Sequence, residues 1–156
     1  MSNLLVQKSL VVASTPNTAF RVFTEGMGRW WPMGTHHIGA AAAADVVIEP
    51  RAGGRWFERG VDGSECDWGR VLTWEPPHRV ELAWEISAEW KADASIQTVV
   101  EVRFTAVEGG TRVDLEHRNL EAYGAAGEAM RGIFDSEGGW TGMLALYADA
   151  ELHAGG

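Results

Sequence analysis

The sequence has little that would tie the protein to a disulfide framework or to a membrane. Its single cysteine, Cys66, excludes an internal disulfide. No apolar run approaches the roughly 18 residues that a membrane-spanning helix needs. The first residues also lack a basic segment followed by an apolar block, which is the pattern of a secretory signal. We therefore expect a cytoplasmic protein.

Basic residues are scarce as well. There are 13 Lys and Arg against 22 Asp and Glu, which gives a formal net charge of -9. This balance repels phosphate backbones and anionic lipid surfaces, so we expect neither nucleic acid nor a membrane as a partner. Phosphate loops, dinucleotide fingerprints and Gly-x-Ser-x-Gly elbows are absent too, and the glycines are interpreted as hairpin turns.

What the sequence does contain is the alternation typical of antiparallel strands. With 156 residues, 46% of them hydrophobic, it predicts a single domain over residues 1–156 with one core. The clearest strand runs from Val80 to Ile86, where apolar residues occupy every second position. Gly53-Gly54 and Asp62-Gly63 predict hairpin turns, because these residues tolerate positive φ. Similar runs elsewhere bring the expected count to about seven strands.

Helices are predicted at two places. Thr15 can cap a helix that begins at Pro16, a position where the missing N–H of proline costs nothing. A long helix is predicted from about Ala125 to Leu152, with a broad apolar face. Four glycines inside this helix are unfavourable for helix formation, and they indicate close packing or a kink near Ser136.

Together these elements describe an α+β helix-grip fold. In it a curved antiparallel sheet of about seven strands wraps around a long C-terminal helix, with two short helices between strands one and two. The motifs resemble the START-like SRPBCC superfamily, and more narrowly its activator of heat-shock-protein ATPase (AHSA-type) group. They are Pro16 with Ala19-Phe20, Trp30-Trp31-Pro32, Glu49-Pro50 with Gly53-Gly54-Arg55, Asp62-Gly63, Trp68-Gly69, Glu75-Pro76-Pro77-His78-Arg79, His117, and Gly139-Trp140 with Leu144.

The resemblance covers about residues 7–150. It implies an apolar cavity between the sheet and the last helix, in which relatives bind lipids, hormones or polyketides, and a few of them act chemically on such ligands. The fold alone does not establish the function. Eukaryotic chaperone activators of this group carry an additional amino-terminal domain for which this chain has no room, so chaperone contact is the least favoured expectation.

Eight tryptophans are unusual for this length, and some of them must be core residues. Trp84 and Trp140 are assigned to the core because both occupy regular periodic positions. A flat aromatic wall suits an apolar ligand, so four others are candidates for the cavity lining. These are Trp30, Trp31, Trp56 and Trp68. Core packing is the alternative for each of the four, and exposed rings in the Trp30–Met33 loop could instead cover a homodimer interface.

Several polar side chains are candidates for reading the polar end of a ligand. If Trp56 sets the inward phase of its strand, Glu58 enters the cavity; the alternative is that Phe57 faces inward and Glu58 is solvated. His117 enters from the last strand, with hydrogen bonding to backbone near the helix start as the alternative. The apolar arc of the last helix supplies three more candidates, Phe134, Glu137 and Thr141. The alternative for Glu137 is contact with water or an arginine.

Metal and nucleophile chemistry are not expected. His36-His37 could join a nearby carboxylate around a metal ion, but adjacent histidines rarely ligate one ion and no zinc spacing is present. Cys66 lies between Glu65 and Asp67, whose charges disfavour a thiolate. We therefore predict no metal and no cofactor.

Three functions remain open. The first is a binding protein that encloses a small hydrophobic or aromatic molecule, with Glu58, Glu137 or His117 contacting its polar end. The second is an enzyme of the cyclase or hydratase kind, in which the same carboxylates and the histidine transfer protons. The third is a protein-interaction module similar to the chaperone activators. We expect the first rather than an enzyme.

Overall fold

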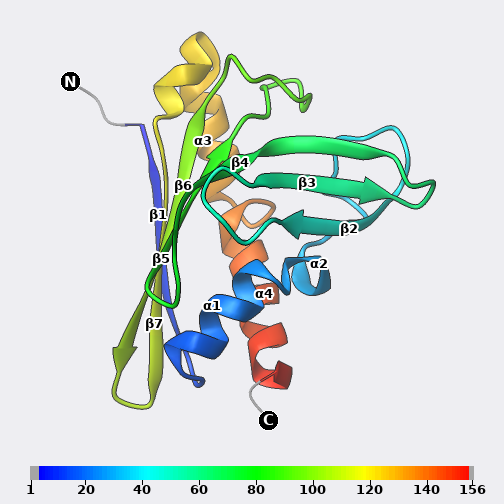
Figure 1. The fold of residues 1–156 in the computed structure, drawn as a ribbon. Coiled ribbons are helices and arrows are strands. Elements are labelled where there is room, and N and C mark those ends of the chain that lie inside the picture. The colour runs from blue at the N-terminus through cyan, green and yellow to red at the C-terminus, as the bar shows by residue number, and fades with distance from the viewer. Residues whose placement is uncertain (1–3, 155–156) are drawn as a thin grey trace.

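The computed structural model describes residues 4–154, and its strands form one seven-stranded antiparallel sheet (Figure 1). The order across the sheet is β1-β7-β6-β5-β4-β3-β2, so the first strand, β1, pairs with the last strand, β7. The strands are β1 Val6–Val12, β2 Ala43–Ile48, β3 Arg55–Gly60, β4 Glu65–Glu75, β5 Arg79–Trp84, β6 Thr98–Val107 and β7 Gly110–Arg118. The sheet bends strongly, with β2 and β3 crossing the direction of β1 and β7.

Two short helices, α1 (Pro16–Thr24) and α2 (Met27–Trp30), connect β1 to β2 as predicted. The Thr15 side chain accepts a hydrogen bond from the backbone N–H of Thr18, and Pro16 occupies the first helical turn. The α1 helix buries Ala19, Phe20 and Phe23 against the sheet and the C-terminal helix. The predicted α+β helix-grip fold is therefore confirmed.

The C-terminal helical segment is interrupted once. A 3₁₀ turn (Leu120–Ala126) leads into α3 (Gly127–Asp135), and α4 (Trp140–Ala154) follows after a break. Ser136 ends α3 in an extended conformation, with ψ 176. The kink predicted near Ser136 is thus present, and α4 lies in the hollow of the bent sheet (Figure 1). None of the helices in residues 4–154 is long and apolar enough to cross a membrane.

Close packing explains two of the four glycines in this segment. A Cβ on Gly139 would lie 2.4 Å from the carbonyl oxygens of Ile133 and Phe134, and one on Gly142 would lie 2.0 Å from the carbonyl of Glu137. Real Cβ atoms do not approach backbone this closely, so the break requires glycine at both positions. A Cβ on Gly132 would meet nothing within 4 Å. Nothing in the structure explains glycine there.

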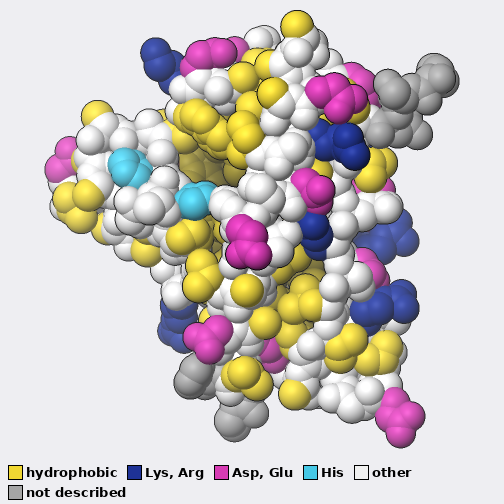
Figure 2. Space-filling model, turned by 180° about the vertical axis from the view of Figure 1, so that it is seen from behind, with side chains coloured by type: hydrophobic (Ala, Val, Ile, Leu, Met, Phe, Trp, Pro, Cys, Tyr) yellow, Lys and Arg dark blue, Asp and Glu magenta, His cyan; other side chains and the backbone are white. Residues whose placement is uncertain are grey.

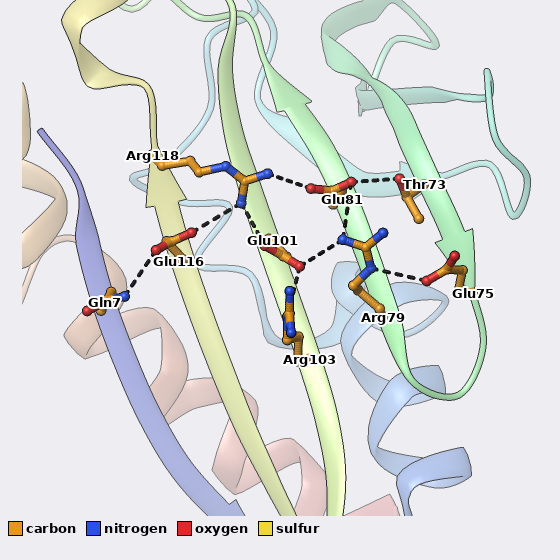
Figure 3. Close-up of polar contacts among 9 residues, drawn as sticks. All are labelled: Gln7, Thr73, Glu75, Arg79, Glu81, Glu101, Arg103, Glu116 and Arg118. Atoms are coloured by element: carbon orange, nitrogen blue, oxygen red, sulfur yellow. Dashed lines mark hydrogen bonds and ion pairs between the residues drawn. The ribbon is translucent and has the colours of Figure 1, made fainter. Parts of the chain in front are cut away.

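The face of the sheet that is turned away from the helices carries a network of ion pairs (Figure 3). At its centre Glu101, which is 7% exposed, contacts Arg79, Arg103 and Arg118. Burial opposes ionisation of Glu101, but the hydrogen bonds from these arginines hold its pKa below the ordinary value. The network links β5, β6 and β7, and it leaves the opposite, concave face of the sheet to apolar residues.

Candidate ligand-binding cavity

A cavity of about 370 Å³ lies between the sheet, the α3–α4 break and the loop that follows α2. Its volume falls in the range of small-molecule sites. Figure 2 shows a hollow lined with hydrophobic side chains, with a histidine at its edge. The cavity implied by the resemblance is therefore present.

Five aromatic rings form much of the cavity wall: Trp31, Trp68, Trp84, Trp90 and Phe134. The ring centroids of Trp31 and Trp68 are 4.9 Å apart, and those of Trp84 and Phe134 are 5.4 Å apart. Neighbouring rings in tilted and edge-to-face arrangements contact one another, so packing constrains the orientation of these four rings before a ligand arrives. Ile38, Ile86, Ile133 and Met143 complete the apolar lining.

Two of the lining residues are unusually exposed for large apolar side chains. Trp90 is 41% exposed and Ile133 is 42% exposed, and both belong to the cavity lining. Trp90 also has a φ of 63°, a left-handed conformation that bulky residues rarely adopt. Such strained residues cluster at functional sites. The two side chains give the cavity an apolar rim.

The polar part of the lining comes from the loop after α2, which contributes Thr35, His36 and His37. His36 Nε2 lies 2.6 Å from the carbonyl oxygen of Gly138, and its Nδ1 lies 2.7 Å from Thr35 Oγ1. Because a carbonyl oxygen only accepts, Nε2 must donate, and in the neutral ring Nδ1 accepts from the threonine. His36 thereby connects the loop to the α3–α4 break.

Glu58 faces inward on the same strand as Trp56 and is not solvated. It lies behind the cavity wall, however, and is not part of the lining. Its carboxylate is 2% exposed and accepts hydrogen bonds from Ile38 N (2.6 Å), Gly39 N (3.1 Å) and Trp68 Nε1 (2.9 Å). These bonds attach the loop to β3 and orient one ring of the wall. Phe57 is buried as well, under the guanidinium of Arg55.

His117 is completely buried and lies outside the cavity lining. Its Nδ1 accepts a hydrogen bond from Trp140 Nε1 (3.0 Å), so Nε2 carries the proton and donates to Thr98 Oγ1 (2.8 Å). Thr98 in turn donates to the carbonyl of Trp84. Burial lowers the pKa of His117 to about 3, which keeps the ring neutral. Both hydrogen-bond partners of His117 are side chains, whereas the alternative prediction was a hydrogen bond to the backbone.

Three of the predicted ligand-binding residues line the cavity: Trp31, Trp68 and Phe134. Trp30 and Trp56 are buried core residues instead, and Trp30 Nε1 donates to the carbonyl of Val22. Since Trp30 and Trp31 are only 4% and 5% exposed, they present no exposed rings for a dimer interface.

Glu137 and Thr141 do not belong to the cavity lining, and both are exposed to solvent. The physical reason is the break at Ser136: a helical wheel drawn through the whole segment assumes a continuous rotation that the chain does not have. Glu137 lies in the break itself, and the Thr141 hydroxyl donates back to the carbonyl of Asp135.

Trp84 is a buried core residue as predicted, and its ring also lines the cavity. Trp90 lines the cavity too, although it is not among the residues selected from the sequence. Trp90 is a large aromatic residue within the otherwise polar stretch 89–95, and this contrast could have indicated a role in ligand binding. The sequence pattern points to the adjacent histidines only as metal ligands. Within the described part of the chain, no three His, Cys, Asp or Glu side chains converge to hold a metal ion.

The family model described as activator of Hsp90 ATPase homolog 1-like protein matches residues 13–146. The chain belongs to this family. The predicted resemblance to the AHSA-type group is thereby confirmed. A search of curated proteins finds no match.

Several solved structures share the fold. The anthrahydroquino-gamma-pyrone synthase Txn09 is 35% identical, with 94% of this chain and 96% of that chain covered and a TM-score of 0.65. CalC from Micromonospora echinospora, a self-sacrificing resistance protein, is 27% identical, with 97% and 96% covered and a TM-score of 0.71. Protein NE0264 from Nitrosomonas europaea, at 15% identity, 96% and 95% coverage and a TM-score of 0.66, shows the fold alone.

Proposed function

We propose that this protein binds a flat, hydrophobic aromatic molecule in the cavity between the sheet and the C-terminal helical segment. The observation that carries the proposal is the wall of five aromatic rings around a space of about 370 Å³. Rings stack on flat ligands at low entropic cost because the surrounding packing already holds them. A cytoplasmic location belongs to the same proposal.

The apolar rim supports this function. Exposed large apolar side chains gathered at a cavity mouth typically mark a binding site. A rim formed by Trp90 and Ile133 can cover the exposed edge of a ligand whose body lies against Trp31 and Trp68. The relative Txn09 is named for a fused-ring aromatic compound, which fits a wall of this kind. We propose neither a chaperone contact nor a homodimer.

The proposal can be tested with anthraquinone and 2-hydroxyanthraquinone as probes. We expect both probes to quench tryptophan fluorescence and to raise the melting temperature in proportion to ligand occupancy. Trp90→Ala should weaken binding by about tenfold, because it removes a rim contact, while the melting temperature of the free protein changes little.

Leu72→Ala is the matched control, since Leu72 is similarly exposed (37%) but lies in β4 outside the cavity lining. Its affinity for both probes should equal that of the unaltered protein. Absence of quenching and of any thermal shift with both probes would refute the proposed function.

A further inference from the structure

Three histidines lie in or beside the cavity wall, and they differ in which ring nitrogens are occupied. Both nitrogens of His36 and both of His117 are hydrogen-bonded. His37 Nδ1 lies 3.1 Å from the carbonyl oxygen of Gly39, and among the described residues its Nε2 has no partner. Since the carbonyl only accepts, Nδ1 carries the proton, and the neutral ring keeps a lone pair on Nε2.

A buried carboxylate lies behind this ring. Glu58 Oε2 is 3.9 Å from His37 Nδ1, and within residues 4–154 His37 is the one Lys, Arg or His side chain that reaches Glu58 within 4.0 Å. The three hydrogen bonds to Glu58 all come from neutral donors. Within residues 4–154 this buried carboxylate therefore has no Lys or Arg side chain within 4.0 Å. An imidazolium at His37 would place a positive charge next to it.

Among the described residues, two further titratable groups lie near this pair: His36, which precedes His37 in the chain, and Cys66, whose thiol is influenced by the charge of Glu58. His36 is held by Thr35 and Gly138 as described. Burial, and then the charges of Glu58 and Asp67, raise the pKa of the Cys66 thiol, so it stays protonated and does not compete as a base. His37 is therefore the group in the cavity lining with an unoccupied basic atom and a carboxylate to stabilise its charged form.

We propose that His37 Nε2 accepts the proton of a phenolic or enolic hydroxyl on the aromatic ligand. The O–H bond breaks, an N–H bond forms on the imidazole, and the electron pair remains on the ligand as an oxyanion. Glu58 acts as a positioning residue that stabilises the imidazolium. The inference rests on the proposed function and narrows it to hydroxylated aromatic compounds. An oxyanion of this kind is also the nucleophile required when an oxygen-containing ring closes.

The absorbance of bound 2-hydroxyanthraquinone tests this step, because ionisation of its hydroxyl shifts the visible spectrum to longer wavelength. We expect the hydroxyl of the bound probe to ionise about one pH unit lower than that of the free probe. His37→Gln should abolish this shift, because glutamine cannot take up the proton, and it should weaken the binding of unsubstituted anthraquinone less than that of the hydroxylated probe. It should also weaken the binding of the hydroxylated probe by about tenfold.

His78→Gln is the control, since His78 is an exposed histidine beyond the cavity lining, at the turn between β4 and β5. A probe that binds but ionises as in water, or a shift that survives in His37→Gln, would overturn the role of His37 and leave the proposed function standing. If neither quinone binds the unaltered protein, the proposed function fails and this inference fails with it.

Discussion

His117 illustrates how a single buried residue can resemble a catalytic group and yet serve the structure. It donates to Thr98, accepts from Trp140 and packs its ring 4.4 Å from that of Phe134. Its position lets it hold β7, β6 and α4 together beneath the cavity wall. A residue with both nitrogens occupied has no free atom with which to accept a proton from a ligand.

The neutral state of His117 predicts a pH-dependent stability. The pKa of His117 is about 3 in the folded protein and near 6.5 in the unfolded chain. Between these two values the unfolded chain is protonated at this residue and the folded protein is not. The contribution of neutral His117 to the free energy of unfolding is fully present above pH 6.5. It is lost as the pH falls toward 3, at up to about 1.4 kcal/mol per pH unit.

Urea unfolding between pH 7 and pH 4 checks this prediction. His117→Asn should be less stable at pH 7, and its free energy of unfolding should approach that of the unaltered protein as the pH decreases. Parallel curves for the two proteins over this range would show that His117 does not contribute the slope.

At the scale of elements, the break between α3 and α4 shapes the cavity. It places Gly138 and Gly139 in the lining, gives His36 a carbonyl to bind, and turns Glu137 out to solvent. An unbroken helix would satisfy that carbonyl internally. The break therefore exchanges helical hydrogen bonds for a contact with the loop after α2.

A pair of glycine substitutions tests this interpretation. Gly132→Ala should raise the free energy of unfolding by about 0.5–1 kcal/mol, because alanine favours helix and the added methyl meets no atom within 4 Å. Gly139→Ala should lower it by several kcal/mol, because the methyl would collide with two backbone carbonyls. Denaturant unfolding of both variants measures the difference; equal effects would contradict the assigned close packing.

At the scale of the whole molecule, the two faces of the sheet have separate tasks. The concave face supplies aromatic rings to the cavity, and the outer face carries the charge network around Glu101 (Figure 3). Partners on three neighbouring strands keep these charges satisfied. Substitutions in the outer face should therefore change stability without changing ligand affinity.

Glu101→Gln is expected to lower the free energy of unfolding by about 1–3 kcal/mol, because three arginines lose their shared carboxylate. The affinity for 2-hydroxyanthraquinone should not change. Glu108→Gln, at the exposed turn between β6 and β7, is the matched control and should alter stability by less than about 0.5 kcal/mol. A loss of probe affinity in Glu101→Gln would show that the two faces are coupled.

The sequence by itself determined the fold, because its signals are local. Alternation from Val80 onward, the Thr15-Pro16 helix start and the glycine turns each depend on neighbours a few residues away. The same kind of signal indicated the kink near Ser136. For Glu58 the local phase left two alternatives open, and only the tertiary structure shows that both Glu58 and Phe57 are buried.

Only the tertiary structure decided which side chains surround the cavity. Trp31 and His37 come from the loop after α2, Trp90 from the loop between β5 and β6, and Phe134 from α3, and no local pattern says that these three segments meet. A buried tryptophan in the core and one in a cavity wall have the same periodicity, because both face away from water. The distinction depends on whether the opposite side of the space is filled, and that is decided by the packing of distant elements.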